Sequence, residues 1–296
     1  MNSWTKILLF FPLLLVFSFV YFGIVFLIYP GSFTGSRIEF DTLISNDHGF
    51  LLLSQVALLL GIFTTILFIS KFFDKQKPAF LNSMLNPKGL IYGMALGAIA
   101  ISVIVLLISL TTKIELSFNG FNINILVYIV LFFLVAISEE AMSRGFIFTN
   151  LYNQSNSYIA IIVSSLIFGL MHAFNSSFNW IGMLNIFLIG IFFCQLYLKR
   201  MDLSIPIGFH FCWNLFQGTV FGFSVSGMTS HGIFKIERLS GAKFPFEGFG
   251  LEGSLICTLV IIILIVWFYI SNTRKIISSD KIELSSINIA KLKVGG

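Results

Sequence analysis

Charged residues are scarce in this chain. Only 10 % of its 296 residues are charged, while 57 % are hydrophobic, and the mean hydropathy is +0.95. A soluble globular domain carries roughly 25 % charged residues, so the composition excludes one. The net charge of +5 follows from the sidedness of a membrane protein, described below, and is no evidence for nucleic-acid binding.

Cysteine pairs, repeats and linkers are also missing. Cys194, Cys212 and Cys257 stand alone inside hydrophobic stretches, without a CxxC motif, so they exclude a disulfide scaffold and are expected to be packing residues. There is no fixed-period repeat, low-complexity tract or Gly/Ser linker. We therefore predict one membrane domain, 1–271, and a short polar cytoplasmic tail, 272–296.

Long hydrophobic runs dominate what remains. Eight stretches are long and apolar enough to cross roughly 30 Å of hydrocarbon, at about 7–29, 50–70, 89–110, 124–148, 157–174, 180–198, 204–223 and 254–271. The sequence thus predicts an all-α, polytopic membrane protein with about eight transmembrane helices. Gly93 and Gly97 form a GxxxG pattern, which is typical of close helix packing. The connection 224–250 is expected to be a plain external loop.

Lysine and arginine predict the orientation. With a cytoplasmic N-terminus, 12 of the 18 basic residues fall inside, 5 fall outside and Arg144 lies in the membrane. The inside set is Lys6, Lys71, Lys75, Lys77, Lys88, Lys199, Arg200, Arg274, Lys275, Lys281, Lys291 and Lys293, and the outside set is Arg37, Lys113, Lys235, Arg238 and Lys243. The positive-inside rule then predicts a multi-pass protein of the cell membrane with both termini in the cytoplasm.

Three ionisable residues interrupt the fourth hydrophobic run. Glu139, Glu140 and Arg144 lie within six positions of one another, and each charge at the centre of a membrane helix costs roughly 2.5–3.5 kcal/mol even on mild scales. Because Glu140 and Arg144 are four residues apart on a helix, they share a face and are predicted to form a structural ion pair that orients Glu139.

Two histidines and an asparagine complete a candidate site. Glu139 and His172 stand at equal sequence distance from the short turn 153–157, so two antiparallel helices would bring both to about 25 Å from that turn. His210 and Asn214 share a face near the start of the seventh run. Counted from the cytoplasm they are shallower than Glu139, and a tilted helix or a dipping loop would close the gap. A site made of all four residues is therefore expected to open to the cytoplasmic half.

These residue types suit hydrolysis. Burial makes a carboxylate more basic, so Glu139 could take a proton from water with help from His172, and His210 and Asn214 could stabilise an oxyanion. Zinc held by Glu and His is an alternative, although no HExxH motif occurs. Serine catalysis has no supporting motif. His48 and His231 are expected to be solvated in external loops.

Three short motifs, in order, resemble those of one family. EEAMSRG at 139–145, FGLMH at 168–172 and HFCWN at 210–214 are similar to the EExxxR, FxxxH and HxxxN motifs of the CPBP family, the CAAX-protease and bacteriocin-processing (Abi) membrane peptidases. The resemblance covers about 122–223 and implies a core of about eight helices related to type II CAAX prenyl endopeptidases. It assigns Glu139, His172, His210 and Asn214 as catalytic, with Glu140, Arg144 and Phe168 in support.

The implied function is an intramembrane endopeptidase that needs no cofactor. Its partners would be the lipid bilayer and a peptide or membrane-protein substrate, and the Phe-, Ile- and Asn-rich composition suggests a bacterial member. One alternative is a zinc-dependent membrane metalloprotease that uses the same residues. A second is a non-catalytic membrane regulator or bacteriocin-immunity protein on the same scaffold. A third, a proton-coupled transporter, lacks the expected inverted repeats and broken helices.

Overall fold

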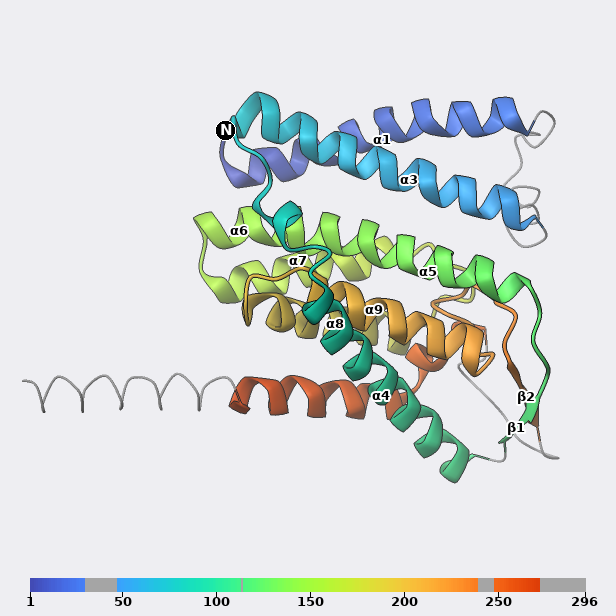
Figure 1. The fold of residues 1–296 in the computed structure, drawn as a ribbon. Coiled ribbons are helices and arrows are strands. Elements are labelled where there is room, and N and C mark those ends of the chain that lie inside the picture. Colours follow the sequence, from blue (N-terminus) through green and yellow to red (C-terminus); the bar gives the residue numbers. More distant parts are fainter. Residues whose placement is uncertain (30–46, 113, 239–247, 272–296) are drawn as a thin grey trace, which may run out of the picture.

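A bundle of long helices makes up almost the whole structure (Figure 1). The computed structural model describes residues 1–29, 47–112, 114–238 and 248–271, so the predicted tail, 272–296, lies outside the described residues. The α-helices are α1 (Ser3–Ile28), α3 (His48–Ile69), α4 (Pro87–Thr111), α5 (Asn124–Glu140), α6 (Thr149–Gln154), α7 (Ser157–Met171), α8 (Trp180–Leu198), α9 (Ser204–Asn214) and the helix Leu255–Ser271.

Short π- and 3₁₀-helical segments join or extend these helices. Three are π-helical, η1 (Ser70–Asp74), η3 (Ala141–Phe148) and η4 (Leu215–Val220). Two are 3₁₀-helical, η2 (Ala79–Asn82) and η5 (Leu251–Gly253). Because η3 continues α5 into α6, the fourth predicted span is one helix from Asn124 to Gln154.

The helices are those of a polytopic membrane protein. Five helical stretches in the described part of the chain are long and apolar enough to span a membrane: Ser3–Ile28, His48–Asp74, Pro87–Thr111, Asn124–Gln154 and Trp180–Leu198. Ser157–Met171 and Leu255–Ser271 are shorter apolar helices. The seventh predicted span, 204–223, corresponds to α9 followed by η4. The all-α, multi-pass class predicted from the sequence is thus confirmed.

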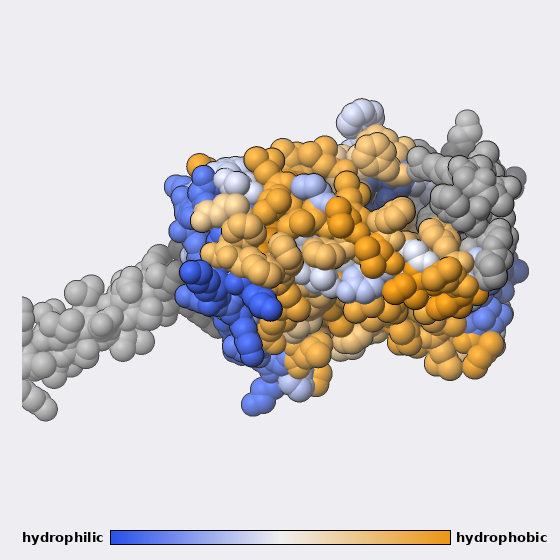
Figure 2. Space-filling model, turned by 90° about the horizontal axis from the view of Figure 1, so that it is seen from above, coloured by the Kyte–Doolittle hydropathy of each residue, from blue (hydrophilic) through white to orange (hydrophobic). Residues whose placement is uncertain are grey.

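Apolar side chains cover the outside of the bundle. Leu8, Leu15, Phe19 and Leu27 on α1 are 73–81 % exposed, as expected for side chains that face lipid. Figure 2 shows this hydrophobic surface across the middle of the molecule, with a larger group of hydrophilic residues at one end and a smaller group at the other. This pattern suits a chain whose middle lies in hydrocarbon and whose ends meet water.

Contacts of the first helix define two ends of the bundle. The Ser3 backbone N–H donates to Gln154 Oε1 at 2.6 Å, and Lys6 forms an ion pair with Asp74. The start of α1 therefore lies beside the end of α6 and the start of α7. We call this the N-terminal end, and we call the opposite end, where α3 and α5 begin and β1 and β2 lie, the far end (Figure 1).

The GxxxG pattern brings α4 against α9. A Cβ atom on Gly93 would collide with the carbonyl oxygen of Ile205, and one on Gly97 with that of Phe209. On the opposite side of the contact, a Cβ on Gly208 would collide with the carbonyl oxygen of Leu90. The glycines let the two backbones touch, so α4 sets the position of α9, as small residues do between membrane helices.

The predicted plain loop 224–250 is wrong in part, because it contains a strand. At the far end, β2 (Phe234–Arg238) pairs antiparallel with β1 (Ile114–Phe118). Both segments alternate apolar and polar residues, IELSF and FKIER, which is the period of a strand with one covered face. Five residues of alternation are easily overlooked beside spans of twenty, and residues 239–247 of this loop lie outside the described chain.

Candidate active site

The paired glutamates stand where α5 changes into a π-helix. Glu140 is the last residue of α5, and η3 begins at Ala141. A π-helical turn is wider than an α-turn, and such segments are frequent at functional sites. Arg144, within η3, places Nη1 2.9 Å from Glu140 Oε1 in an ion pair in which both side chains are at most 1 % exposed.

Arg144 is enclosed by aromatic rings. Its guanidinium carbon lies 4.3 Å from the ring centroid of Phe168 and 4.8 Å from that of Phe193. Nη2 donates a hydrogen bond of 3.2 Å to the carbonyl oxygen of Gly190. Phe168 and Phe193 thus provide cation–π contacts that help a buried cation to remain charged, and they join η3 to α7 and α8.

His210 is held by the same carboxylate. Its Nδ1 lies 3.0 Å from Glu140 Oε1, and its ring stacks on Phe193 with centroids 5.3 Å apart. This depth is possible because α9 begins inside the protein, where Asp202 and Ser204 are buried and Asp202 Oδ1 accepts from the Ser204 backbone N–H at 3.0 Å. The loop before α9 therefore dips into the bundle, which is one of the two ways foreseen to bring His210 to the level of Glu139.

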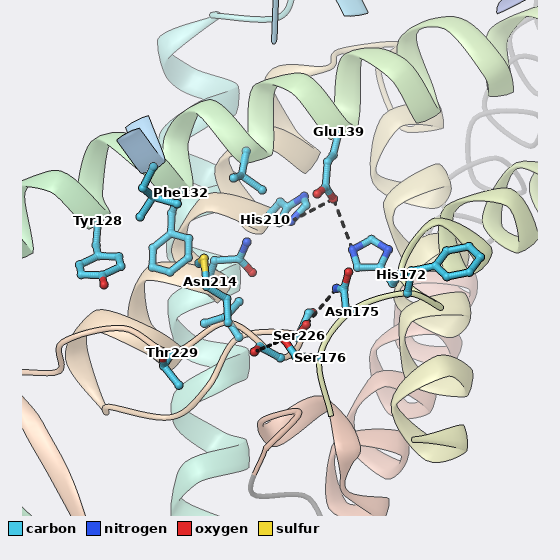
Figure 3. Close-up of a pocket in the computed structure, with 16 residues that line it drawn as sticks. Tyr128, Phe132, Glu139, His172, Asn175, Ser176, His210, Asn214, Ser226 and Thr229 are labelled. Atoms are coloured by element: carbon cyan, nitrogen blue, oxygen red, sulfur yellow. Dashed lines mark hydrogen bonds and ion pairs between the residues drawn. The ribbon is translucent and has the colours of Figure 1, made fainter. Parts of the chain in front are cut away.

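Glu139 faces both histidines across a gap (Figure 3). Its Oε2 lies 3.7 Å from His172 Nε2 and 3.9 Å from His210 Nε2. His172 caps the end of α7, and its Nδ1 lies 2.9 Å from the carbonyl oxygen of Phe168. Within the described chain, Glu139 Oε2 has no hydrogen-bond partner. Glu139 and His172, from two helices of one hairpin, thus meet at the same height.

A cavity of about 510 Å³ lies in front of these groups. Glu139, His172, His210 and Asn214 all line it, with Asn214 one turn after His210 on α9. The sequence predicted an opening to the cytoplasmic half, on the side of the N-terminus. In the structure the cavity extends to the far end, where Leu51 of α3, Tyr128 of α5 and the segment 225–229 after η4 line it. The sequence count placed His210 too shallow because it took the loop before α9 to lie at the surface.

A family match covers the segment that contains these residues. Residues 121–216 match the family described as type II CAAX prenyl endopeptidase Rce1-like. This segment is therefore similar to an Rce1-like domain. The match includes all three motifs quoted above, from Glu139 to Asn214. No curated protein and no solved structure matches the chain.

The rim of the Rce1-like site contains residues that the motifs did not indicate. Asn175 Nδ2 donates to the Ser226 carbonyl oxygen at 2.9 Å, and Ser176 Oγ donates to that of Gly227 at 3.1 Å. Ser226 and Gly227 have positive φ angles of 46° and 93°, in a turn closed by backbone hydrogen bonds between Val225 and Met228. The Ser-Gly pair was a turn signal in the sequence, but nothing there linked it to the cavity.

A second buried carboxyl group lies behind the Rce1-like site. Glu252 in η5 accepts hydrogen bonds from Gln217 Nε2 and, at 3.3 Å, from Ser226 Oγ. Burial raises the pKa of the Glu252 carboxyl above its ordinary value. A cavity of about 30 Å³, lined by Glu252, His172, His210 and Asn214 among others, separates it from the site. Glu252 lies outside the matched segment and had no motif to mark it.

Of the two remaining histidines, His231 is exposed, as predicted, whereas His48 begins α3 and is half buried, so the prediction is wrong for His48. His48, at the start of α3, has its ring centroid 5.7 Å from that of Tyr128 and 6.0 Å from that of His231. Tyr128 lines the cavity. The three rings meet because β2 and the segment before it fold back over the start of α5, which sequence spacing did not reveal.

The described side chains do not form a preorganised metal-binding site. Across the described ranges, no three His, Cys, Asp or Glu side chains are grouped so that they could hold a metal ion. The mechanism proposed below uses the chain's own side chains, and a chelator experiment tests the metal alternative.

Proposed function

We propose that this chain is an intramembrane endopeptidase in which Glu139 and His172 activate a water molecule and His210 and Asn214 stabilise the oxyanion. The observation that carries the proposal is the convergence of Glu139 Oε2 on His172 Nε2 and His210 Nε2, at 3.7 and 3.9 Å, inside a cavity of about 510 Å³. The peptidase family matched by residues 121–216 supports the reaction class.

The distances suit a bridging water. At 3.7 Å the Glu139 and His172 side chains are too far apart for a direct hydrogen bond, and such separations are commonly bridged by water. His172 Nδ1 faces a carbonyl oxygen, which only accepts, so Nδ1 carries the proton and Nε2 of the neutral ring is an acceptor. A water between them can donate one hydrogen to Nε2 and one to Glu139, and it then directs a lone pair towards the cavity.

Glu140 prepares His210 for a different role. His210 Nδ1 donates to the Glu140 carboxylate, so a neutral ring would have no proton on Nε2 to give to an oxyanion. A protonated His210 ring carries a proton on Nε2 that it can donate to the oxyanion. With His210 protonated, the two positive charges of Arg144 and His210 balance the two negative charges of Glu139 and Glu140, as a buried cluster requires. The Asn214 amide supplies the second donor.

The reaction then balances without another reactant. Glu139 takes a proton from water as the oxygen attacks the carbonyl carbon, and His210 and Asn214 hold the resulting oxyanion. The tetrahedral intermediate collapses with cleavage of the C–N bond, and Glu139 passes its proton to the departing nitrogen. The products are a carboxylic acid and an amine, and transfer of the acid's proton to the amine in water gives a carboxylate and an ammonium group.

The cavity favours internal peptide bonds. Among the described residues that line it there is no lysine or arginine to bind a terminal carboxylate. We therefore propose cleavage within a peptide or within a segment of another membrane protein. A prenylated tail, named in the family's description, is one such substrate class to be tested.

The test is cleavage of a peptide library by the protein purified in detergent, with products read by mass spectrometry. We expect the wild-type protein to cut and the Glu139→Gln protein, folded to the same extent, to show no turnover. Retained turnover by Glu139→Gln would end the proposal. A chelator arm tests the metal alternative: loss of cleavage that zinc restores would make Glu139 a ligand rather than the base.

A non-catalytic regulator makes the opposite prediction in cells. If the chain acts only by binding a partner, a strain with Glu139→Gln at the wild-type protein level keeps its full phenotype. If it acts by cleavage, the same strain behaves like a deletion strain.

A further inference from the structure

The cavity opens at the far end of the bundle. Its rim at this end is formed by Leu51 near the start of α3, Tyr128 near the start of α5 and residues 225–229, which follow the end of η4. Both α3 and α5 begin at the far end and run towards the N-terminal end (Figure 1). A substrate that enters through this rim therefore arrives from the side opposite the N-terminus.

The two ends carry very different numbers of basic residues. Among the described residues, seven lie at the N-terminal end, on or beside the ends of helices: Lys6, Lys71, Lys75, Lys77, Lys88, Lys199 and Arg200. At the far end, the described basic residues are Lys235 and Arg238 of β2. The positive-inside rule assigns the basic end to the cytoplasm. The rim of the cavity then lies on the outer side of the membrane.

One face of α5 leads from the rim to Glu139. Tyr128, Phe132, Val135 and Glu139 all line the cavity, and their spacing of four, three and four residues keeps them on one helix face. From Tyr128 to Glu139 the helix rises about 16 Å. An extended peptide rises about 3.3 Å per residue, so about five residues fit along this face.

The walls of this channel differ in chemistry. Phe132, Val135 and Leu51 of α3 form an apolar side, and the 225–228 turn with Asn175 and Ser176 forms a polar side. The polar side is fixed, because Asn175 and Ser176 both donate to the turn and the Gly227 N–H donates to the Phe249 carbonyl oxygen at 2.9 Å. Apart from Glu139, His172 and His210, no charged or titratable side chain except Tyr128 is among the described lining residues.

We infer that the substrate is an extended, largely apolar peptide segment presented at the outer face of the membrane. It lies along α5 with side chains against Phe132, Val135 and Leu51 and its main chain beside the 225–228 turn. An exported peptide and the outer end of a membrane-anchored segment share this chemistry. The inference rests on the proposed endopeptidase function and excludes a cytoplasmic protein tail as the substrate.

Cysteine labelling in intact cells tests the side directly. The three native cysteines are buried, so a single added cysteine dominates the signal. Thr229→Cys places a thiol on the exposed part of the rim, and Asn153→Cys places one on the exposed last turn of α6 at the N-terminal end. We expect a membrane-impermeant maleimide to label Thr229→Cys in intact cells and Asn153→Cys only after permeabilisation. The reverse pattern would overturn the inference and leave the proposed chemistry standing.

Cleavage of peptides added to the outside of spheroplasts tests which class of substrate the protein cuts. A library of short apolar peptides, free in one arm and fused to a membrane anchor in the other, is added to spheroplasts that produce the protein. We expect Glu139-dependent cleavage in at least one arm, and the arm identifies the source. If only the detergent-solubilised protein cuts the library, the outer-face inference fails. If neither sample cuts, or if Glu139→Gln cuts equally, the proposed function fails.

A substitution that narrows the channel tests whether the substrate binds along α5. Val135→Phe adds bulk to the apolar wall, whereas Val130→Phe makes the same change at a position on the same helix that is 48 % exposed and outside the cavity. We expect Val135→Phe to raise KM about tenfold or more, and Val130→Phe to leave it unchanged. Equal KM values for Val135→Phe and wild type would contradict the binding of substrate along α5.

Discussion

The two adjacent glutamates have opposite environments, one on the closed side of the site and one on the open side. On the closed side, Glu140 is fully buried and its Oε1 contacts both Arg144 and His210. On the open side, Glu139 faces the cavity, and its nearest described charge partners are 3.7 and 3.9 Å away. Adjacent residues of one helix thus differ: Glu140 is a structural charge paired through Oε1, and Glu139 is a carboxylate without a partner at hydrogen-bond distance.

This difference teaches how an acid can be reactive inside a membrane protein. A buried charge needs partners, and the Arg144–Glu140–His210 network supplies them on the closed side. The network leaves Glu139 free of strong bonds while it holds the histidine opposite in place. We expect closed-side substitutions to cost stability and open-side substitutions to cost activity alone.

The largest expected effect is the loss of Arg144. Arg144→Leu leaves Glu140 buried without its ion-pair partner, which we expect to lower the free energy of unfolding by about 3–5 kcal/mol. Thermal unfolding in detergent measures it. The matched control is Lys235→Leu, which removes the exposed Lys235–Glu237 pair and should cost less than about 1 kcal/mol.

Removal of both closed-side charges separates stability from function. The double variant Glu140→Leu/Arg144→Met replaces the ion pair with apolar side chains, and we expect it to recover most of the stability lost in Arg144→Leu. It should stay inactive, because His210 loses the carboxylate beside Nδ1. Recovered cleavage in this variant would show that the closed side serves stability alone.

Next in size is a change at the α4–α9 contact. Gly97→Ala places a methyl group against the Phe209 carbonyl oxygen, so α9 must move away. We expect a loss of about 1–3 kcal/mol in the free energy of unfolding together with reduced cleavage, since Phe209 precedes His210. Gly23→Ala on α1 is the control, because no atom lies within 4 Å of the added Cβ. Equal stability of the two variants would contradict the close contact.

A smaller effect is expected at the ring that orients His210. Phe193→Leu removes the stacking on His210 and one of the two rings over Arg144, so kcat should fall about 2- to 10-fold. Phe192→Leu serves as the control, because that buried ring contacts Phe209 and Phe268 instead. If both variants lose stability equally, only Phe193→Leu should show the additional loss in kcat.

Glu252 should make a modest contribution that depends on pH. Because burial raises its pKa above the ordinary value of 4.5, its neutral form favours folding. That contribution is fully present below the ordinary value and is lost as the pH rises through the raised pKa. We expect the melting temperature of the wild type to decline over this window relative to that of Glu252→Gln, which stays neutral. Parallel curves for the two proteins would contradict a raised pKa.

Sequence reasoning predicted the elements that depend on local pattern. Hydrophobic length predicted the helices, i,i+4 spacing predicted the Glu140–Arg144 pair, and hairpin symmetry brought Glu139 to His172. It did not predict the contact of Glu140 with His210, because these residues are 70 positions apart on helices whose depths depend on a dipping loop. It also placed the opening at the wrong end for the same reason.

Other features had no usable signal in the sequence. Phe193 is one of 36 phenylalanines, so nothing distinguished the ring that stacks on His210. Glu252 lies 112 positions after Glu140 and after a long loop, and only folding brings it behind the site. The roles of Glu139, His172, His210 and Asn214 remain proposals that substitution must test.

The most direct test is a paired measurement on Glu139→Gln, its thermal stability and its cleavage rate with a peptide that the wild type cuts. Because Glu139 makes no strong bond on the open side, we expect the free energy of unfolding to change by no more than about 0.5 kcal/mol. We expect kcat to fall by about 10²- to 10⁴-fold, as loss of a general base requires. A destabilised protein that still cuts at the wild-type rate would contradict the division between Glu139 and Glu140.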